Sequence, residues 1–93
     1  MFYREEFVWD DGNTGHIAEH GVEAWEVEEA FSDYDRIEEQ AYNVPGERRW
    51  AFIGATEVGR ILFVVYTYRT GKIRVVTARG AEDKERRKYR RRR

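Results

Sequence analysis

The sequence contains no cysteine, a single proline and no long apolar run. Without cysteine there is no disulfide bond and no thiol nucleophile, and most structural zinc sites are excluded. No segment approaches the roughly 18 apolar residues of a membrane-spanning helix. The amino-terminal MFYREEFVWDD also lacks the basic stretch and apolar core of a signal peptide. We therefore expect a cytoplasmic protein with no membrane contact, no metal ion and no other cofactor.

Basic residues are scarce in the first half of the chain. Positions 1 to 45 hold two Lys/Arg and thirteen Asp/Glu, a net charge of −11. Positions 46 to 93 hold fifteen Lys/Arg and five Asp/Glu, a net charge of +10, so the overall charge is only −1. Phosphates are attracted to concentrated positive charge. The basic half is therefore the part that could bind nucleic acid.

The length and composition predict one small folded domain. The chain has 93 residues, of which 41% are hydrophobic, and it includes fourteen Phe, Trp and Tyr residues. Disordered chains lack such aromatic content, although 38% of the residues here are charged. We expect a single domain over residues 1–93 that ends in a basic tail at 86–93.

Turn signals divide the chain into eight expected elements. The turn-forming Asp10-Asp11-Gly12-Asn13 ends a first edge strand, Thr14 is the expected N-cap of a short helix, and Gly21 stops that helix. The expected elements are a strand at 2–9, helices at 14–21 and 23–32, strands at 35–43, 47–56, 60–68 and 72–78, and a helix after position 80. This order predicts an α+β domain with a mainly antiparallel sheet packed by helices.

Arginine recurs along residues 60–79, which otherwise read as a strongly apolar hairpin. A guanidinium group is permanently charged and forks toward phosphate or carboxylate, so arginines on a sheet suggest an anion-binding surface. With a two-residue loop at Thr70-Gly71, Arg69 shares a face with Thr67 and Arg74. With a three-residue loop, Arg69 instead shares a face with Arg79. The sequence leaves both registers open.

Aromatic residues offer a further way to bind nucleic acid, because bases stack on aromatic rings. We expect Trp9, Trp25 and Trp50 to pack in the core, since a small domain needs large apolar side chains there. Tyr66 and Tyr68 lie on one face of the same expected strand. They are the better candidates for stacking.

Short motifs occur in a fixed order along most of the chain. They are FVWD at 7–10, HGV at 20–22, EAF at 29–31, TYR at 67–69 and RVVTAR at 74–79. Isolated matching residues are Asp33, Glu47, Arg49, Arg60, Glu85 and Tyr89. In this order they resemble the BrnT toxins of bacterial type II toxin–antitoxin systems.

The resemblance implies a RelE-like ribonuclease toxin that cuts RNA and is silenced by a BrnA-like antitoxin. It implies that operator DNA is bound only through the toxin–antitoxin complex, and that the antitoxin gene lies beside the toxin gene. Cleavage of RNA without a metal needs a base for the 2′-hydroxyl, cations for the growing phosphorane charge, and an acid for the leaving oxygen. The candidate catalytic residues are Arg49, Arg69 and Arg79 as phosphate clamps, with His20 or Glu47 as the proton carrier. Candidate substrate-binding residues are Arg60, Arg74, Thr67 and Tyr68.

Four of the candidates also have a structural interpretation. Arg49 and Arg69 can pair with glutamates, His20 can cap the end of a helix, and Glu47 can form a salt bridge beside a turn. Two positions depart from the family pattern, with Glu19 where lysine is usual and Arg48 where an acidic residue is common. These departures favour an alternative: a catalytically attenuated module that binds antitoxin or nucleic acid. A third interpretation is that acidic helices and the basic sheet pair between subunits.

Overall fold

The computed structural model describes residues 6–41 and 43–91, and within them the predicted order of elements is confirmed. The strands are β1 (Phe7–Val8), β2 (Ile37–Glu39), β3 (Trp50–Ala55), β4 (Ile61–Arg69) and β5 (Lys72–Gly80). The helices are α1 (Asp11–Ala18), α2 (Ala24–Phe31) and α3 (Asp83–Arg90). Part of the expected first strand, at 2–5, and the last residues of the basic tail, at 92–93, lie outside the described residues.

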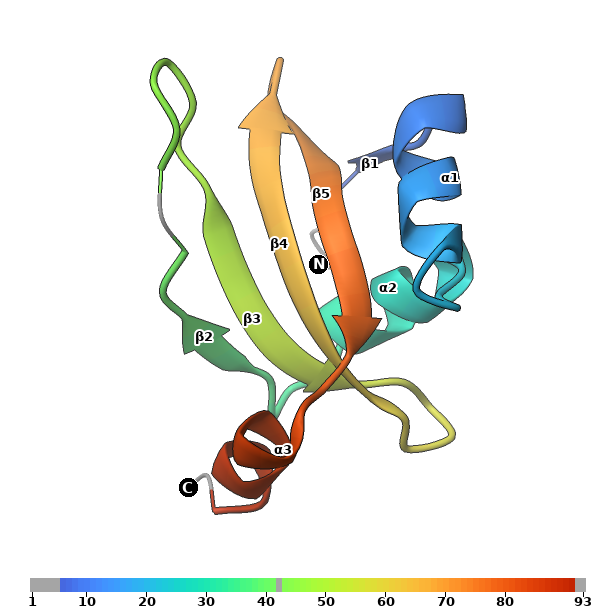
Figure 1. Cartoon of the computed structure of the whole chain (residues 1–93), viewed down its shortest axis with the longest axis vertical. Coiled ribbons are helices and arrows are strands. Elements are labelled where there is room, and N and C mark those ends of the chain that lie inside the picture. The colour runs from blue at the N-terminus through green and yellow to red at the C-terminus, as the bar shows by residue number, and fades with distance from the viewer. Residues whose placement is uncertain (1–5, 42, 92–93) are drawn as a thin grey trace, which may run out of the picture.

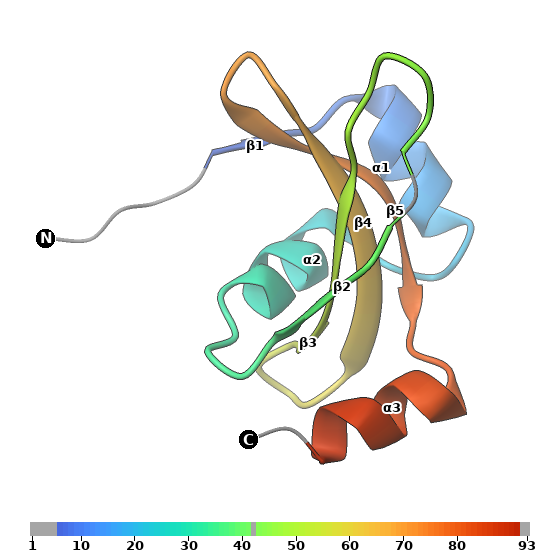
Figure 2. The ribbon, with the colours of Figure 1, turned by 90° about the vertical axis from the view of Figure 1, so that its left-hand side faces the viewer.

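The five strands form one mixed sheet in the order β1-β5-β4-β3-β2 (Figure 1). β1 is an edge strand, as predicted, and pairs parallel to β5, whereas the other neighbours are antiparallel. Together with the three helices this confirms the α+β class. Figures 1 and 2 both show α3 at the end of the sheet where β5 ends.

One face of the sheet carries the hydrophobic core. We call it the core face and define it by the buried Phe52, Leu62, Val64 and Val75. α2 packs against β3 and β4 on this face, and α1 packs against β5. A Cβ atom on Gly54 would lie only 2.6 Å from the Ala30 carbonyl oxygen, so glycine permits the close approach of α2.

The predicted N-cap of the first helix is wrong. α1 begins at Asp11, because the Asp10 carboxylate accepts the Asn13 backbone N–H at 3.1 Å and the Asn13 amide oxygen accepts the Asp10 N–H at 2.8 Å. This reciprocal capping turns the expected loop into the first helical turn. Gly21, at φ 73°, ends the helix as predicted, and the Val22 N–H donates to the Ile17 carbonyl.

The prediction that all three tryptophans pack in the core is wrong for Trp25. Trp9 and Trp50 are partly buried against the core, but the Trp25 side chain projects from α2 and is 52% exposed. The apolar residues that α2 buries are Val27 and Ala30, which lie three residues apart on the same side of the helix. Trp25 lies outside that stripe.

Candidate functional site

The hairpin between β4 and β5 has the two-residue loop, and a bulge adds Arg79 to the face that Arg69 and Arg74 share. Thr70 and Gly71 both have positive φ, at 51° and 78°, as a tight hairpin turn requires. Arg69 then pairs with Lys72 and Thr67 with Arg74. The register shifts at Val65/Tyr66, so that Phe63 pairs with Arg79. Since β4 alternates regularly, Phe63, Val65, Thr67 and Arg69 lie on the outer face of the sheet. Their β5 partners on the same face are Arg79, Thr77, Arg74 and Lys72. We call this the arginine face.

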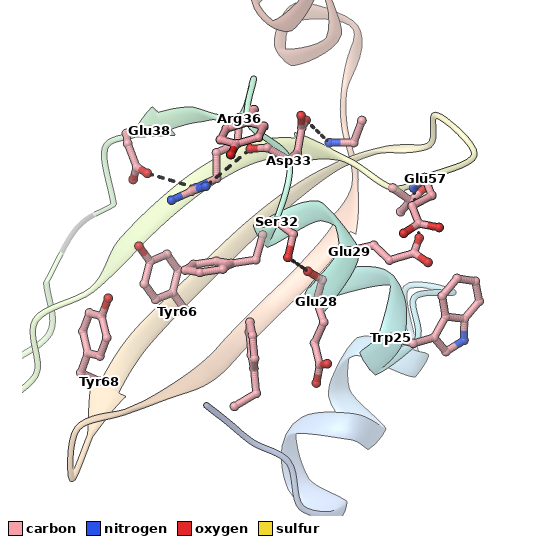
Figure 3. A pocket seen from close by; sticks show the side chains of 15 residues that line it. Trp25, Glu28, Glu29, Ser32, Asp33, Arg36, Glu38, Glu57, Tyr66 and Tyr68 are labelled. Atoms are coloured by element: carbon pink, nitrogen blue, oxygen red, sulfur yellow. Dashed lines mark hydrogen bonds and ion pairs between the residues drawn. The ribbon is translucent and has the colours of Figure 1, made fainter. Parts of the chain in front are cut away.

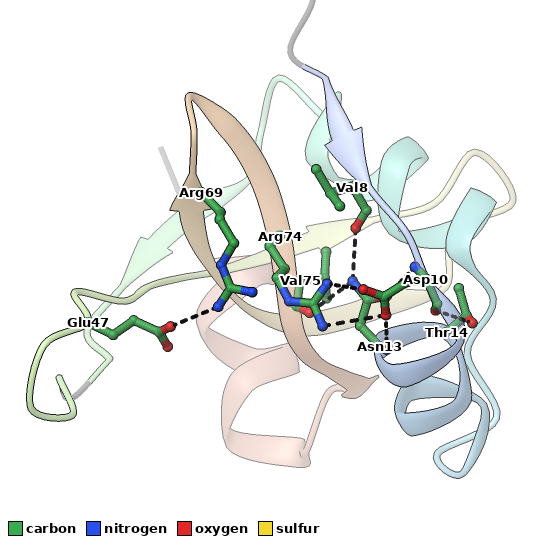
Figure 4. Close-up of polar contacts among 8 residues, drawn as sticks. All are labelled: Val8, Asp10, Asn13, Thr14, Glu47, Arg69, Arg74 and Val75. Carbon is green, nitrogen blue, oxygen red and sulfur yellow. Dashed lines mark hydrogen bonds and ion pairs between the residues drawn. The ribbon is translucent and has the colours of Figure 1, made fainter.

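Arg49, which comes directly before the core-facing Trp50, and Arg69 converge on one carboxylate at the arginine face. Arg49 Nε donates to Glu47 Oε2 at 2.7 Å. An Arg69 terminal nitrogen lies 3.6 Å from Glu47 Oε1 (Figure 4). A turn at Val44–Glu47 brings Glu47 back beside the start of β3. Thr67 Oγ1 fixes the adjoining backbone by donating to the Arg48 carbonyl oxygen at 2.6 Å. We call Glu47, Arg49 and Arg69 the Glu47 cluster.

The electrostatics of the Glu47 cluster keep its carboxylate charged. The hydrogen bond from Arg49 has the largest effect on the pKa of Glu47 and lowers it. Desolvation by burial opposes this effect, but the charges of Arg49 and Arg69 and a hydrogen bond from Arg69 also lower the pKa, so the net shift is downward. Arg69 is the most accessible member, with 58% of its side chain exposed. The cluster therefore offers an ionised proton acceptor next to two cations, one of which faces solvent.

Arg74 lies on the same face but is tied to the start of α1. One of its terminal nitrogens lies 2.6 Å from Asp10 Oδ2, and this hydrogen bond is the largest cause of the lowered pKa of Asp10 (Figure 4). The Asn13 amide donates to the Val8 carbonyl oxygen at 2.9 Å. Arg74 thus anchors α1 to β5. The sequence reasoning missed Asp10 and Asn13, although their spacing is that of a capping box.

The structure does not bring Arg79 or Arg60 to the Glu47 cluster. Along β4, Arg79's partner Phe63 lies six residues from Arg69, or about 20 Å at the usual rise of a strand. The Arg79 guanidinium forks onto Glu85 at 2.8 and 2.9 Å and lies 4.5 Å from the centre of the Phe63 ring. Arg60 donates to Glu26 at 2.9 Å and to the Gly21 carbonyl at 3.0 Å. Both arginines join elements of the fold.

His20 also lies away from the Glu47 cluster. His20 follows the carboxyl end of α1, whereas Arg74 contacts Asp10, which caps the amino end. The eight residues of α1 separate these two ends by about 12 Å. The His20 backbone N–H donates to the Ile17 carbonyl, and its ring contacts that of His16 at 5.5 Å. Of the two predicted proton carriers, only Glu47 lies beside the arginines.

Tyr68 lies on the core face, so it does not share a face with Arg69 or Thr67. Tyr66 is on the same face, with ring centres 5.9 Å apart, but it is only 6% exposed, whereas Tyr68 is 43% exposed. Arg48 likewise lies on the core side of the sheet, where its guanidinium is 5.3 Å from the Trp50 ring. Base stacking by Tyr68 stays a prediction.

Residues 6–41 and 43–91 contain neither a metal-binding cluster nor a membrane-spanning helix. No group of three or more His, Cys, Asp or Glu side chains in these ranges is arranged to hold a metal ion. No helix there is long and apolar enough to cross a membrane.

Comparison with known proteins identifies the family. The family model described as "Ribonuclease toxin, BrnT, of type II toxin-antitoxin system" matches residues 9–85. That match includes all of the Glu47 cluster and most of the described elements. No curated protein sequence matches the chain. The match spans well over half of the 93 residues, and the chain belongs to the BrnT family of ribonuclease toxins of type II toxin–antitoxin systems.

Proposed function

We propose that the Glu47 cluster is the site at which this toxin cleaves RNA, without a metal ion, by attack of a 2′-hydroxyl on the adjacent phosphate. The observation that carries the proposal is the convergence of Arg49 and Arg69 on the ionised carboxylate of Glu47. A base with one cation hydrogen-bonded to it at 2.7 Å and a second cation 3.6 Å away supplies two of the three requirements of this reaction.

In the proposed reaction, a Glu47 carboxylate oxygen accepts the proton of the 2′-hydroxyl. The 2′-oxygen bonds to phosphorus, the bond to the 5′-oxygen breaks, and that oxygen takes a proton from solvent. The products are a 2′,3′-cyclic phosphate and a 5′-hydroxyl. Arg49 and Arg69 stabilise the phosphorane oxygens. Arg69 can turn toward a phosphate at little cost, because its 3.6 Å contact with Glu47 is long and exposed.

The other predicted residues have supporting roles in this proposal. Arg74 and Thr67 hold the arginine face in place, through Asp10 and the Arg48 carbonyl respectively. Arg60, Arg79 and His20 lie at the far end of the fold and contribute to its stability. The basic side chains of α3 add salt-dependent attraction to RNA without reading its sequence.

The type II family implies an antitoxin partner. We further propose that this partner is BrnA-like, that operator DNA is bound only through the complex, and that the toxin acts in the cytoplasm, where its RNA substrate lies. We also propose that residues 1–93 fold as one domain, with a RelE-like arrangement.

The ion pairs of the arginines support a second candidate function, a catalytically attenuated module that binds antitoxin or nucleic acid. Glu47 neutralises part of the charge of Arg49 and Arg69 before any phosphate arrives. In that case the protein binds RNA, and the binding weakens with salt, but no product forms.

The chemistry is tested with a short single-stranded RNA, incubated with the purified toxin in EDTA. The proposal predicts cleavage, with a 2′,3′-cyclic phosphate at the new end and no cleavage at a position that carries a 2′-deoxy sugar. Cleavage at the deoxy position would exclude attack by the 2′-hydroxyl. Cleavage that requires added Mg²⁺ would exclude the metal-independent route, and binding without cleavage would favour the second candidate.

A further inference from the structure

A groove lies on the opposite side of β4 from the Glu47 cluster. It has a volume of about 1560 Å³ and extends along α2 from the β3–β4 turn at 55–57 to Tyr68, close to the β4–β5 hairpin. Trp25, Glu28 and Glu29 line it from α2, and Tyr66 and Tyr68 line it from β4 (Figure 3). Adjacent residues of a strand point to opposite faces, so Tyr68 faces the groove while Arg69 faces the proposed cleavage site.

Exposed apolar side chains gather in this groove. Four large apolar side chains are exposed within the described ranges, and three of them line it: Trp25 at 52%, Tyr34 at 101% and Tyr68 at 43%. The fourth, Val58, lies outside the groove lining. A concentration of exposed aromatic side chains marks an interaction surface, and aromatic residues supply much of the binding energy at such surfaces.

The charge of the groove excludes a phosphate-rich ligand. Its lining includes one guanidinium, from Arg36, and five carboxylates, from Glu28, Glu29, Asp33, Glu38 and Glu57. Some of these carboxylates are held by neighbours: Glu28 accepts the Trp9 indole N–H at 2.7 Å, and Glu29 accepts the Glu57 backbone N–H at 3.0 Å. An RNA strand would be repelled here. A positively charged peptide segment with apolar anchors would complement both the charge and the aromatic side chains.

We propose that this groove docks a basic segment of the antitoxin, whose aliphatic or aromatic side chains pack against Trp25 at one end and Tyr68 at the other. The proposal rests on the antitoxin partner of the family and does not depend on the Glu47 cluster being the cleavage site. Because the groove and the Glu47 cluster lie on opposite faces of β4, docking and cleavage are separable. Changes in the groove yield a toxin that keeps its activity and escapes neutralisation.

The test measures the affinity of full-length toxin variants for the antitoxin encoded beside the toxin gene, by titration calorimetry. Trp25→Ala removes a large exposed anchor and is expected to weaken binding about 30-fold, whereas its matched control Val58→Ala changes it less than threefold. The double variant Glu38→Lys/Glu57→Lys is expected to weaken binding at least tenfold and to lessen its dependence on salt. The variant Asp11→Lys reverses an exposed carboxylate outside the groove lining and serves as its control.

RNA cleavage and melting temperature are measured for the same variants, and both are expected to match the natural chain. The proposal is overturned if the groove variants bind the antitoxin as the controls do. It is also overturned if they abolish self-association of the toxin instead, because the occupant would then be a second copy. Absence of RNA cleavage by the natural chain would contradict the proposed function alone, since the binding comparison does not use it.

Discussion

Replacing Arg79 with alanine is expected to destabilise the fold by about 2 kcal/mol, because this arginine attaches α3 to β5. Its guanidinium makes two hydrogen bonds to Glu85, at 2.8 and 2.9 Å, and lies 4.5 Å from the Phe63 ring centre. A well-oriented ion pair of this kind contributes about 1 kcal/mol, and a partly exposed cation–π contact adds about 0.5–1 kcal/mol. At roughly 4–8 °C per kcal/mol for a domain of this size, the melting temperature falls by about 10 °C.

A double-mutant cycle isolates the ion pair. The melting temperature is measured for three variants: Arg79→Ala, Glu85→Gln and the double variant. The control is Arg87→Ala, which removes an exposed arginine of α3 and should change the free energy of unfolding by less than about 0.5 kcal/mol. The coupling energy between Arg79 and Glu85 is expected near 1 kcal/mol. If Arg79→Ala melts like Arg87→Ala while RNA cleavage is lost, Arg79 acts on the substrate and its structural assignment here is wrong.

Two further predictions concern acid stability and packing. Hydrogen bonds from Arg74 and Arg49 are the chief causes that lower the pKa values of Asp10 and Glu47 below the usual 3.8 and 4.5. The ionised carboxylates therefore stabilise the fold fully above the usual pKa values. This stabilisation is lost as the pH falls through the lowered pKa values of the folded protein. Urea titrations between pH 7 and pH 2 should show that the free energy of unfolding falls with pH in the natural chain and falls less in Asp10→Asn. An equal fall in the two proteins would contradict the role of Asp10. Gly54→Ala should cost about 1–3 kcal/mol, because its Cβ would meet the Ala30 carbonyl at 2.6 Å, whereas Gly15→Ala, with open space around it, should stabilise α1. A Gly54→Ala variant that melts like the natural chain would show that α2 moves away freely.

Turn chemistry and alternating apolar residues sufficed to predict most elements of this fold. The strands on either side of Thr70-Gly71 carry branched and aromatic residues, which favour strands. The helix of residues 24–31 is capped by Glu23 at its start and Ser32 at its end. The first helix was misplaced because Asp10 and Asn13 also form a common turn sequence. Only their reciprocal hydrogen bonds distinguish the helix start from a loop.

The arrangement of the arginines could not be predicted from the sequence. The two possible loop lengths predict Arg69 on a face with either Arg74 or Arg79, whereas the structure joins all three on one face through a bulge in β5. Nothing at Val76 marks that bulge, since valine suits a regular strand equally well. The meeting of Glu47 with Arg69 depends on how β3 and β4 pair, which is a long-range property of the sheet.

The central claim is that the Glu47 cluster cleaves RNA, and neighbouring arginines on opposite faces of the sheet test it most directly. Arg49 contacts Glu47 on the arginine face, whereas Arg48 lies over Trp50 on the core side. The rate of cleavage of a short RNA in EDTA should fall about 100- to 1000-fold in Arg49→Ala and stay within about threefold in Arg48→Ala, with both variants melting near the natural chain. Equal rates in the two folded variants would contradict the account.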